Sequence, residues 1–199
     1  MKKRGIDIYM KFNEWLTLRE SEQIVTPAES SPVPVTQPQL PDAKRVMYTA
    51  CVLHKYSQTS LVTAMQKLMF EATGSGIPKG WIVRAHHMTV KFSPRQSDIE
   101  AIASMLGKEV ELEAVGWAHD DYGIAVVVKP KGSFPLGNDV PHVTVAHSKE
   151  VGAVYSNTLL SDRSKWIPME MSLSSELCCV LKDNVTTIPQ LVNPASPTL

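Results

Sequence analysis

Apolar and polar residues follow two different periods along the middle of the chain. Short runs that are apolar, or that alternate with polar residues, predict strands, and they cover residues 46–53, 82–92, 110–117, 124–128, 141–147 and 169–181. Apolar residues at every third or fourth position predict helices over 58–72 and 98–106. Strands interrupted by two or three helices, without strict strand–helix alternation, favour an α+β domain.

Helical faces and turn residues refine this picture. In the first helix Leu61, Met65, Leu68 and Met69 share one face, which predicts packing on a sheet. Ser97 is the expected N-cap of the second helix. The expected turns and loops are 74–80, 120–123 and 132–139.

The two ends of the chain differ from its middle. Residues 1–24 include a short amphipathic helix over 6–22, whose apolar stripe either docks on the domain itself or binds a partner protein. Residues 25–43 hold prolines among serine, threonine and glutamine, which predicts a semi-rigid linker. Further prolines mark 184–199 as a flexible tail, so the compact domain is expected over 44–183.

Composition narrows the class of ligand. The chain has 199 residues, no formal net charge and 43% hydrophobic residues, which suits one globular domain with appended segments. Without net positive charge it has no broad electrostatic hold on a long nucleic acid. A small nucleotide, or one end of an RNA, is the better-matched ligand.

The cysteines and the hydropathy of the chain indicate the cellular compartment. The three cysteines form no disulfide framework, and we expect small buried thiols in a reducing compartment. A nucleophilic role is disfavoured because no Cys-His pattern accompanies them. The basic start of the chain lacks the apolar core of a signal peptide, and no run approaches the roughly 20 apolar residues of a membrane helix. We therefore expect a soluble, cytoplasmic protein without membrane contact.

Two matched His-x-Thr triplets are the strongest chemical signal. They are His87-Met88-Thr89 and His142-Val143-Thr144, each inside a predicted strand. Because side chains alternate along a strand, the histidine and threonine of each triplet share one face, and the apolar residue between them faces the other way. Two such strands side by side would place two imidazoles and two hydroxyls around one cleft.

This set of side chains suits the hydrolysis of a phosphodiester. A base must remove a proton from water and an acid must protonate the leaving ribose oxygen, and histidine can serve as either near neutral pH. His87 and His142 are the candidate acid and base, and the sequence does not distinguish their roles. The hydroxyls of Thr89 and Thr144 would donate to phosphate oxygens. The arrangement requires no metal ion and no cofactor.

Strand alternation also sorts the neighbouring residues. Lys91 shares the face of the first triplet, where it either steadies a phosphate or is a solvated charge at the strand end. His86 and His147 fall on the opposite face unless a bulge intervenes, and we expect them to be structural. Arg84 has the parity of His86, which disfavours it as a residue of the cleft entrance. Tyr48 either stacks on a base or packs within the protein.

The paired triplets resemble the motifs of the 2H phosphoesterase superfamily. The resemblance covers about residues 46–181 and is carried by Tyr48-Thr49-Ala50, by Arg84-Ala85-His86-His87-Met88-Thr89-Val90 and by Pro141-His142-Val143-Thr144-Val145-Ala146-His147. It implies two pseudo-symmetric α+β lobes, with antiparallel sheets lining a central cleft and helices on the outside. It also implies that the two histidines are the acid and base and that the two threonines bind phosphate.

The resemblance leaves the substrate open. The superfamily includes RNA 2′,3′-cyclic phosphodiesterases, proteins described as 2′-5′ RNA ligases, the cyclic phosphodiesterase domains of tRNA ligases, and phage enzymes that destroy cyclic nucleotide signals. The leading hypothesis is a metal-independent phosphodiesterase acting on a 2′,3′-cyclic phosphate RNA end or a small cyclic nucleotide, in RNA repair, RNA processing or signalling. The alternatives are a nucleotide- or RNA-end-binding module without turnover, and an enzyme that also recruits a partner through the helix over 6–22.

Overall fold

The computed structural model describes residues 40–133, 135–182 and 186–187. Its strands are β1 (Val46–Leu53), β2 (Ile82–Val83), β3 (His87–Phe92), β4 (Glu109–His119), β5 (Gly123–Pro130), β6 (His142–His147), β7 (Ile167–Leu181) and β8 (Thr186–Thr187). Its helices are α2 (Lys55–Thr73), α3 (Gln96–Ala101) and α4 (Tyr155–Leu159), with the 3-10 turns η1 (Ala43–Arg45), η2 (Ala103–Met105) and η3 (Arg163–Lys165). An antiparallel sheet with a few helices makes the domain α+β, as the sequence predicts.

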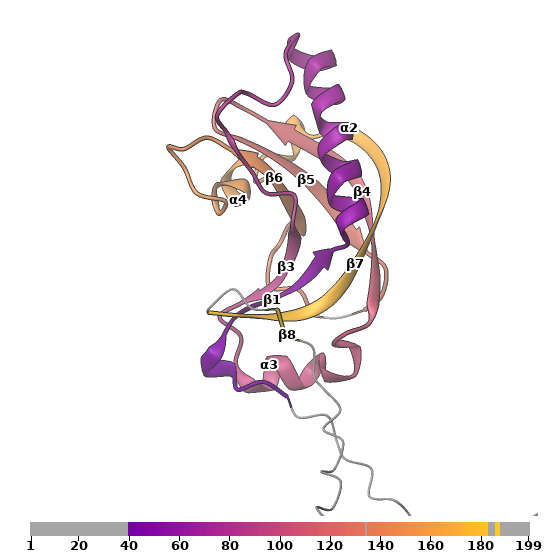
Figure 1. The fold of residues 1–199 in the computed structure, drawn as a ribbon, viewed down its shortest axis with the longest axis vertical. Coiled ribbons are helices and arrows are strands. Elements are labelled where there is room, and N and C mark those ends of the chain that lie inside the picture. Colours follow the sequence, from indigo (N-terminus) through magenta and orange to yellow (C-terminus); the bar gives the residue numbers. More distant parts are fainter. Residues whose placement is uncertain (1–39, 134, 183–185, 188–199) are drawn as a thin grey trace, which may run out of the picture. The chain divides into compact units, whose positions relative to one another are not determined.

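The sheet closes on itself. Its strands follow the order β1-β3-β6-β5-β4-β7, each neighbouring pair is antiparallel, and β7 pairs again with β1. The short strand β2 pairs with β6, and β8 pairs with β7. Figure 1 shows β7 as a long, strongly curved ribbon that passes from β4 to β1. The strands that carry the two triplets, β3 and β6, are neighbours within this ring, and each has a further partner on its other side.

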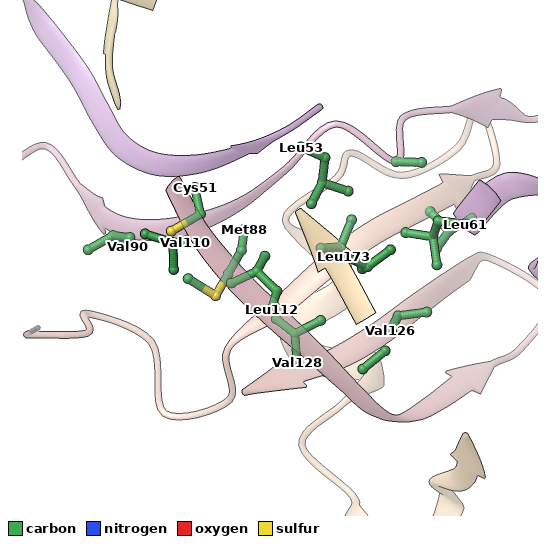
Figure 2. Close-up of a cluster of buried hydrophobic side chains, with 14 of the residues drawn as sticks. Cys51, Leu53, Leu61, Met88, Val90, Val110, Leu112, Val126, Val128 and Leu173 are labelled. Atoms are coloured by element: carbon green, nitrogen blue, oxygen red, sulfur yellow. The ribbon is translucent and has the colours of Figure 1, made fainter. Parts of the chain in front are cut away.

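The main hydrophobic core lies on one face of the sheet, where α2 and the segment around α3 contribute buried side chains. Figure 2 shows part of this cluster. The labelled side chains come from β1, α2, β3, β4, β5 and β7, and are Cys51, Leu53, Leu61, Met88, Val90, Val110, Leu112, Val126, Val128 and Leu173. Burial of this set stabilises the fold by roughly 25 cal/mol for each Å² of apolar surface removed from water.

Helix α2 has the buried face that the sequence predicts. Leu61, Met65 and Met69 are each at most 4% exposed, and all belong to the main core. The helix ends at Gly74, whose φ of 77° is left-handed and costs glycine no steric clash. The N–H of Gly74 donates to the carbonyl oxygen of Phe70 at 2.9 Å, which satisfies one of the last helical carbonyls.

Two predicted elements differ from the structure in their bounds. The strand predicted over 82–92 is interrupted, because β2 ends at Val83 and β3 begins at His87. The helix predicted over 98–106 is divided into α3 and η2. The prediction that Ser97 caps this helix is wrong, since Ser97 lies inside α3.

The start of α3 is instead closed by its own aspartate. The carboxylate of Asp98 accepts the backbone N–H of Arg95, the residue before the helix, at 2.8 Å. The sequence pattern also gives no element between residues 148 and 166, where α4 and η3 form. These short elements have too few apolar positions to show a helical period.

The predictions for the two ends fall mostly outside the described residues. The helix over 6–22, and with it the proposed partner contact, lies outside them, as does most of the linker over 25–43. In the segment predicted as a tail, Thr186 and Thr187 form β8 on β7. Within the described part of the chain, no helix combines the length and the hydropathy that a membrane span requires.

Candidate functional site

The two predicted triplets lie on neighbouring strands. Strands β3 and β6 are antiparallel, and Met88 pairs with Val143. In this register each histidine lies across from the threonine of the other triplet. The two cross-strand pairs are His87 with Thr144 and Thr89 with His142. A local two-fold axis through the central Met88–Val143 pair therefore relates one triplet to the other.

The four polar side chains of the triplets face away from the main core. Met88 and Val143 lie between them along the strands and are fully buried in that core, at 0% exposure. On the neighbouring strand β5, Ala125 and Val127 pair with the polar residues of the second triplet. Both belong to a second, smaller apolar cluster to which α4 contributes. The triplets therefore share their face of the sheet with this smaller cluster.

His142 is only 9% exposed. Its Nδ1 lies 2.7 Å from the carbonyl oxygen of Val140, and because a carbonyl can only accept, this nitrogen carries the hydrogen. In the neutral ring the lone pair is then on Nε2. Burial lowers the pKa of His142, and the bond to the Val140 carbonyl acts in the opposite direction because it stabilises the imidazolium.

His87 is held between two other rings. The ring of Tyr48 stacks on it with centroids 4.8 Å apart and planes inclined by 19°. The ring of His86 meets it edge-on, with 3.1 Å between the two Nδ1 atoms. Burial lowers the pKa of His87 to about 4, and the charges of His86, His142 and Arg84 act in the same direction. The His87 ring is therefore neutral at pH 7.

Ala85 changes the course of the chain just before β3. Its backbone is left-handed, with φ of 44°, and its N–H donates to the carbonyl oxygen of Thr144 at 2.9 Å. Side chains therefore cease to alternate between the two faces of the sheet at this residue. The prediction that His86 lies away from the triplets is wrong, because its ring contacts that of His87. Arg84 also lies close enough for its charge to lower the pKa of His87.

Lys91 does not join the triplets. The β1–β3 register shifts by one residue, so that Ala50 pairs with Thr89 but Thr49 pairs with Lys91. This β-bulge turns Lys91 toward the face of Thr49, and both line a small cavity beside α3 together with Val90. The prediction that Lys91 shares the face of Thr89 is therefore wrong.

His147 is buried at the end of β6, and its orientation does not follow from simple alternation. The β5–β6 register shifts at Val145, which is an extra residue on β6. His147 is 3% exposed, and its Nδ1 lies 2.8 Å from the carbonyl oxygen of Ser148. It is also roughly 10 Å along the strand from Thr144, at about 3.3 Å per residue.

Comparison with known protein families identifies the domain that carries these triplets. The family described as the fungal tRNA ligase phosphodiesterase domain matches residues 68–188, which is more than half of the chain. The chain belongs to this family. It is thereby a member of the 2H phosphoesterases, as the triplets predict. The match begins within α2 and includes both triplets, while β1 with Tyr48 precedes it. No curated protein matches the chain.

The phosphodiesterase domain brings a further hydroxyl to the second triplet. The Oγ of Ser156 lies 2.9 Å from Oγ1 of Thr144, which is also 3.3 Å from the carbonyl oxygen of Ala153. Ser156 belongs to α4 and is 2% exposed. The sequence analysis does not single it out, because no motif surrounds it and only the fold places it beside Thr144.

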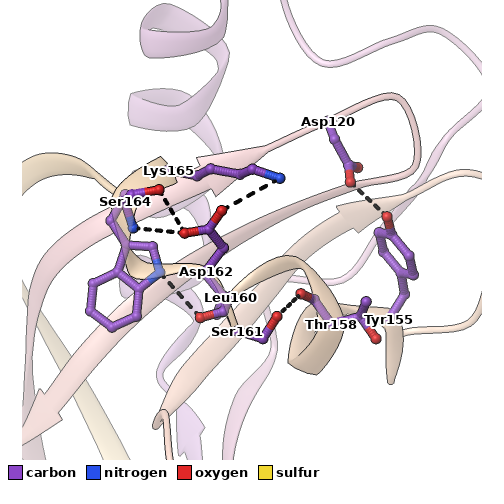
Figure 3. Close-up of polar contacts among 9 residues, drawn as sticks. Asp120, Tyr155, Thr158, Leu160, Ser161, Asp162, Ser164 and Lys165 are labelled. Carbon is purple, nitrogen blue, oxygen red and sulfur yellow. Dashed lines mark hydrogen bonds and ion pairs between the residues drawn. The ribbon is translucent and has the colours of Figure 1, made fainter.

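A network of polar contacts holds the segment that carries Ser156. The hydroxyl of Tyr155 donates to Oδ2 of Asp120 at 2.6 Å, a contact drawn in Figure 3. The other carboxylate oxygen of Asp120 accepts two backbone N–H groups of its own turn, each at 2.9 Å. At the other end of the segment, Nε1 of Trp166 donates to the carbonyl oxygen of Leu160 at 3.2 Å. Asp120 is thus a turn residue, as predicted from the sequence.

A hollow on the surface of the phosphodiesterase domain lies away from the triplets. It follows α2 and is lined by Val62, Thr63, Gln66, Lys67, Phe70 and Glu71. None of these residues belongs to β3 or β6, so the hollow contains neither triplet histidine and neither triplet threonine. The candidate site is the face of β3 and β6 that carries the triplets.

Proposed function

We propose that this domain hydrolyses the 2′,3′-cyclic phosphate at the end of an RNA, using the two triplet histidines and no metal ion. Membership of the tRNA ligase phosphodiesterase family supports the reaction class and an RNA substrate. One observation carries the assignment of residues. The pairing of Met88 with Val143 gives both histidines and both threonines one common face.

The spacing of the imidazoles suits a phosphate between them. Residues that are diagonal neighbours on an antiparallel pair are roughly 7–8 Å apart, and His87 and His142 are related in this way. One phosphorus atom with its oxygens fits between two imidazoles at that separation. The charge of His142 lowers the pKa of His87, which supports their closeness.

His87 is the proposed base and His142 the proposed acid. A base must be neutral before it acts, and burial, together with the charge of Arg84 and the charges that His86 and His142 carry when protonated, keeps His87 neutral down to about pH 4. An acid must hold a proton, and the Val140 carbonyl stabilises the imidazolium of His142. When one proton is shared by the pair, it therefore resides on His142.

The reaction balances with these two residues alone. His87 removes a proton from water while the water oxygen attacks phosphorus. The bond from phosphorus to one ribose oxygen breaks, and His142 gives its proton to that oxygen. The products are a phosphomonoester and a ribose hydroxyl, and the seating of the ribose decides whether the phosphate stays at the 2′ or the 3′ position. Thr89 donates a hydrogen bond to a non-bridging oxygen, where negative charge grows, and Thr144 does the same once its hydroxyl turns from the Ala153 carbonyl.

We also propose how the cleft and the segments of the chain are arranged. The face of β3 and β6 forms the floor of a cleft between two lobes, which the local two-fold relation of the triplets supports. Residues 44–183 are the catalytic domain, preceded by the helix over 1–24 and the linker over 25–43 and followed by the tail over 184–199. The three cysteines are free and buried, which fits a cytoplasmic protein.

The test is hydrolysis of a 2′,3′-cyclic mononucleotide and of a short RNA with a cyclic phosphate end. We expect His87→Ala and His142→Ala each to lower kcat by roughly 10²–10⁴-fold, the usual contribution of a positioned proton transfer. The matched control is His119→Ala, because His119 stacks on Trp117 in β4, away from the triplet strands. It should retain activity.

Two results would overturn this function. Full activity in either triplet variant would exclude the acid–base pair, and loss of activity with a chelator would exclude the metal-independent mechanism. Binding of the cyclic phosphate without product after long incubation would instead indicate a module that recognises RNA ends. Equal turnover of cyclic oligonucleotides and RNA ends would contradict the proposed substrate class.

A further inference from the structure

The two triplet histidines differ in what their Nδ1 atoms contact. Nδ1 of His142 faces a carbonyl oxygen, which fixes the position of its hydrogen. Nδ1 of His87 faces Nδ1 of His86 at 3.1 Å. A carbonyl only accepts, whereas an imidazole nitrogen accepts or donates according to where its own hydrogen is. The tautomer of His142 is therefore fixed, and that of His87 depends on its neighbour.

Only one hydrogen fits between the two Nδ1 atoms. When His87 donates it, the Nε2 of His87 keeps a lone pair and can accept a proton from water. When His86 donates it, the neutral His87 ring must carry its hydrogen on Nε2, where it can no longer act as a base. A protonated His86 has only donors, so it permits the second arrangement alone.

We propose that His86 is a positioning residue that sets the tautomer of His87, and that protonation of His86 switches Nε2 of His87 from proton acceptor to proton donor. The inference rests on the proposed function of His87 as the base. His86 does not touch the substrate in this role. It acts only through the 3.1 Å contact between the two Nδ1 atoms.

The surroundings keep His86 neutral at neutral pH, which is the form in which its Nδ1 can accept a hydrogen. Partial burial lowers the pKa of His86, and the charge of Lys55, at the start of α2, acts in the same direction. The other titratable or charged groups that face the His86–His87 pair are Arg84 beside it, Tyr48 on β1 and His142 on β6. The cations among them also disfavour a further positive charge.

The direct test observes the tautomer. Long-range imidazole ¹H–¹⁵N spectra of the ¹⁵N-labelled full chain at pH 7.5 should show the hydrogen of His87 on Nδ1, with the signals assigned by their loss in His87→Gln. In His86→Ala the hydrogen should move to Nε2 in a substantial fraction of molecules. His86→Asn is the matched variant, because its amide oxygen stands near the place of Nδ1 and accepts without titrating. It should keep the wild-type tautomer.

Activity provides an independent measurement. We expect His86→Ala to lower kcat by about tenfold with little change in KM, which is a part of the roughly 10²–10⁴-fold that a positioned proton transfer contributes. His86→Asn should recover most of this loss and should lack the ionisation of His86 in its pH profile.

An unchanged His87 tautomer in His86→Ala, or a wild-type hydrogen on Nε2 at pH 7.5, would overturn the inference. Because the spectra need no substrate, an inactive protein with the expected tautomers would contradict the proposed function and not the role of His86. Much of the His86 side chain remains exposed beside His87, so its variants are expected to fold, and a thermal melt checks this directly.

Discussion

Tyr48 lies flat against His87, with ring centroids 4.8 Å apart, although the two residues are on different strands. Tyr48 pairs with Phe92 and His87 pairs with Val52, so the stacked rings come from positions four residues apart along β1, with the small residue Ala50 between them. Stacking removes one face of the imidazole from water, and burial is the largest cause of the low pKa of His87. We therefore expect Tyr48 to contribute to the low pKa of the proposed base through this burial.

Replacing Tyr48 should change the pH dependence of the enzyme more than its maximum rate. In Tyr48→Ala the His87 ring gains water, so its pKa should rise from about 4 toward the ordinary 6.5. A base with a higher pKa is protonated at pH 5, and activity there should fall relative to pH 7. The measurements are an NMR titration of His87 and kcat/KM at both pH values. Tyr48→Phe keeps the stacked ring and should behave as the wild type; an equal loss in both variants would show that the hydroxyl matters instead.

The pH–rate profile should be displaced to the acid side. Two deprotonations give the rising limb: that of the proposed base His87, with a pKa of about 4, and that of His86, whose pKa burial also lowers. The proposed acid, His142, has a pKa lowered from 6.5 by burial, so the falling limb should lie below that value. We expect kcat/KM for a 2′,3′-cyclic nucleotide to be greatest between the two limbs. A maximum at or above pH 7 in the free enzyme would contradict both assignments.

Stability should also depend on pH through His87. The folded-state pKa of about 4 is below the ordinary 6.5 of an unfolded chain, so the unfolded state binds more protons between these values. The free energy of unfolding should therefore fall as the pH falls from 6.5 to 4, by up to about 3 kcal/mol from this residue. In His87→Gln this part of the dependence should be absent. Urea unfolding of both proteins at several pH values checks this, and parallel curves would refute it.

Ser156 should support phosphate binding through Thr144. In Ser156→Ala the hydroxyl of Thr144 loses its 2.9 Å partner and keeps only the longer contact with Ala153. We expect KM for the cyclic phosphate to rise several-fold, with a loss of stability of about 1 kcal/mol, as for one hydrogen bond.

The matched control for Ser156→Ala is Ser161→Ala. The Ser161 hydroxyl donates to the carbonyl oxygen of Thr158 at 2.8 Å in the same segment, and it does not contact a triplet residue. Steady-state kinetics and urea unfolding separate the two effects. A rise in KM in both variants would show that the segment as a whole is responsible.

Much of the sheet follows from the period of the sequence. Alternation in β3 and β6 places the histidine and threonine of each triplet on the face away from Met88 and Val143, because the strands are regular around this pair. The alternation of apolar and polar residues does not predict where the β-bulges fall. A strand with one extra residue looks the same in sequence as a strand without it.

The irregular positions explain why the sequence misplaced His86 and Lys91 relative to the triplets. Ala85 has a left-handed backbone, which is uncommon for alanine. This conformation places the His86 ring in contact with the His87 ring. The shift between Thr89 and Lys91 removes Lys91 from the triplet face. Both errors arise from counting alternate residues through an irregular segment, and they are revealed by the backbone of Ala85 and by the pairing of β3 with β1.

The antiparallel pairing of β1 with β7 has a consequence for how the polypeptide can be connected. Val46 at the start of β1 pairs with Leu181 at the end of β7, and the N–H of Lys182 donates to the carbonyl oxygen of Arg45 at 3.0 Å. The places where the backbone enters and leaves the ring are thus adjacent. A circular permutant, with these two places joined by a short glycine-serine segment and new termini opened in the loop after Gly74, should keep the geometry of β3 and β6. For the same reason the domain can be fused at both ends to other proteins without separating its histidines.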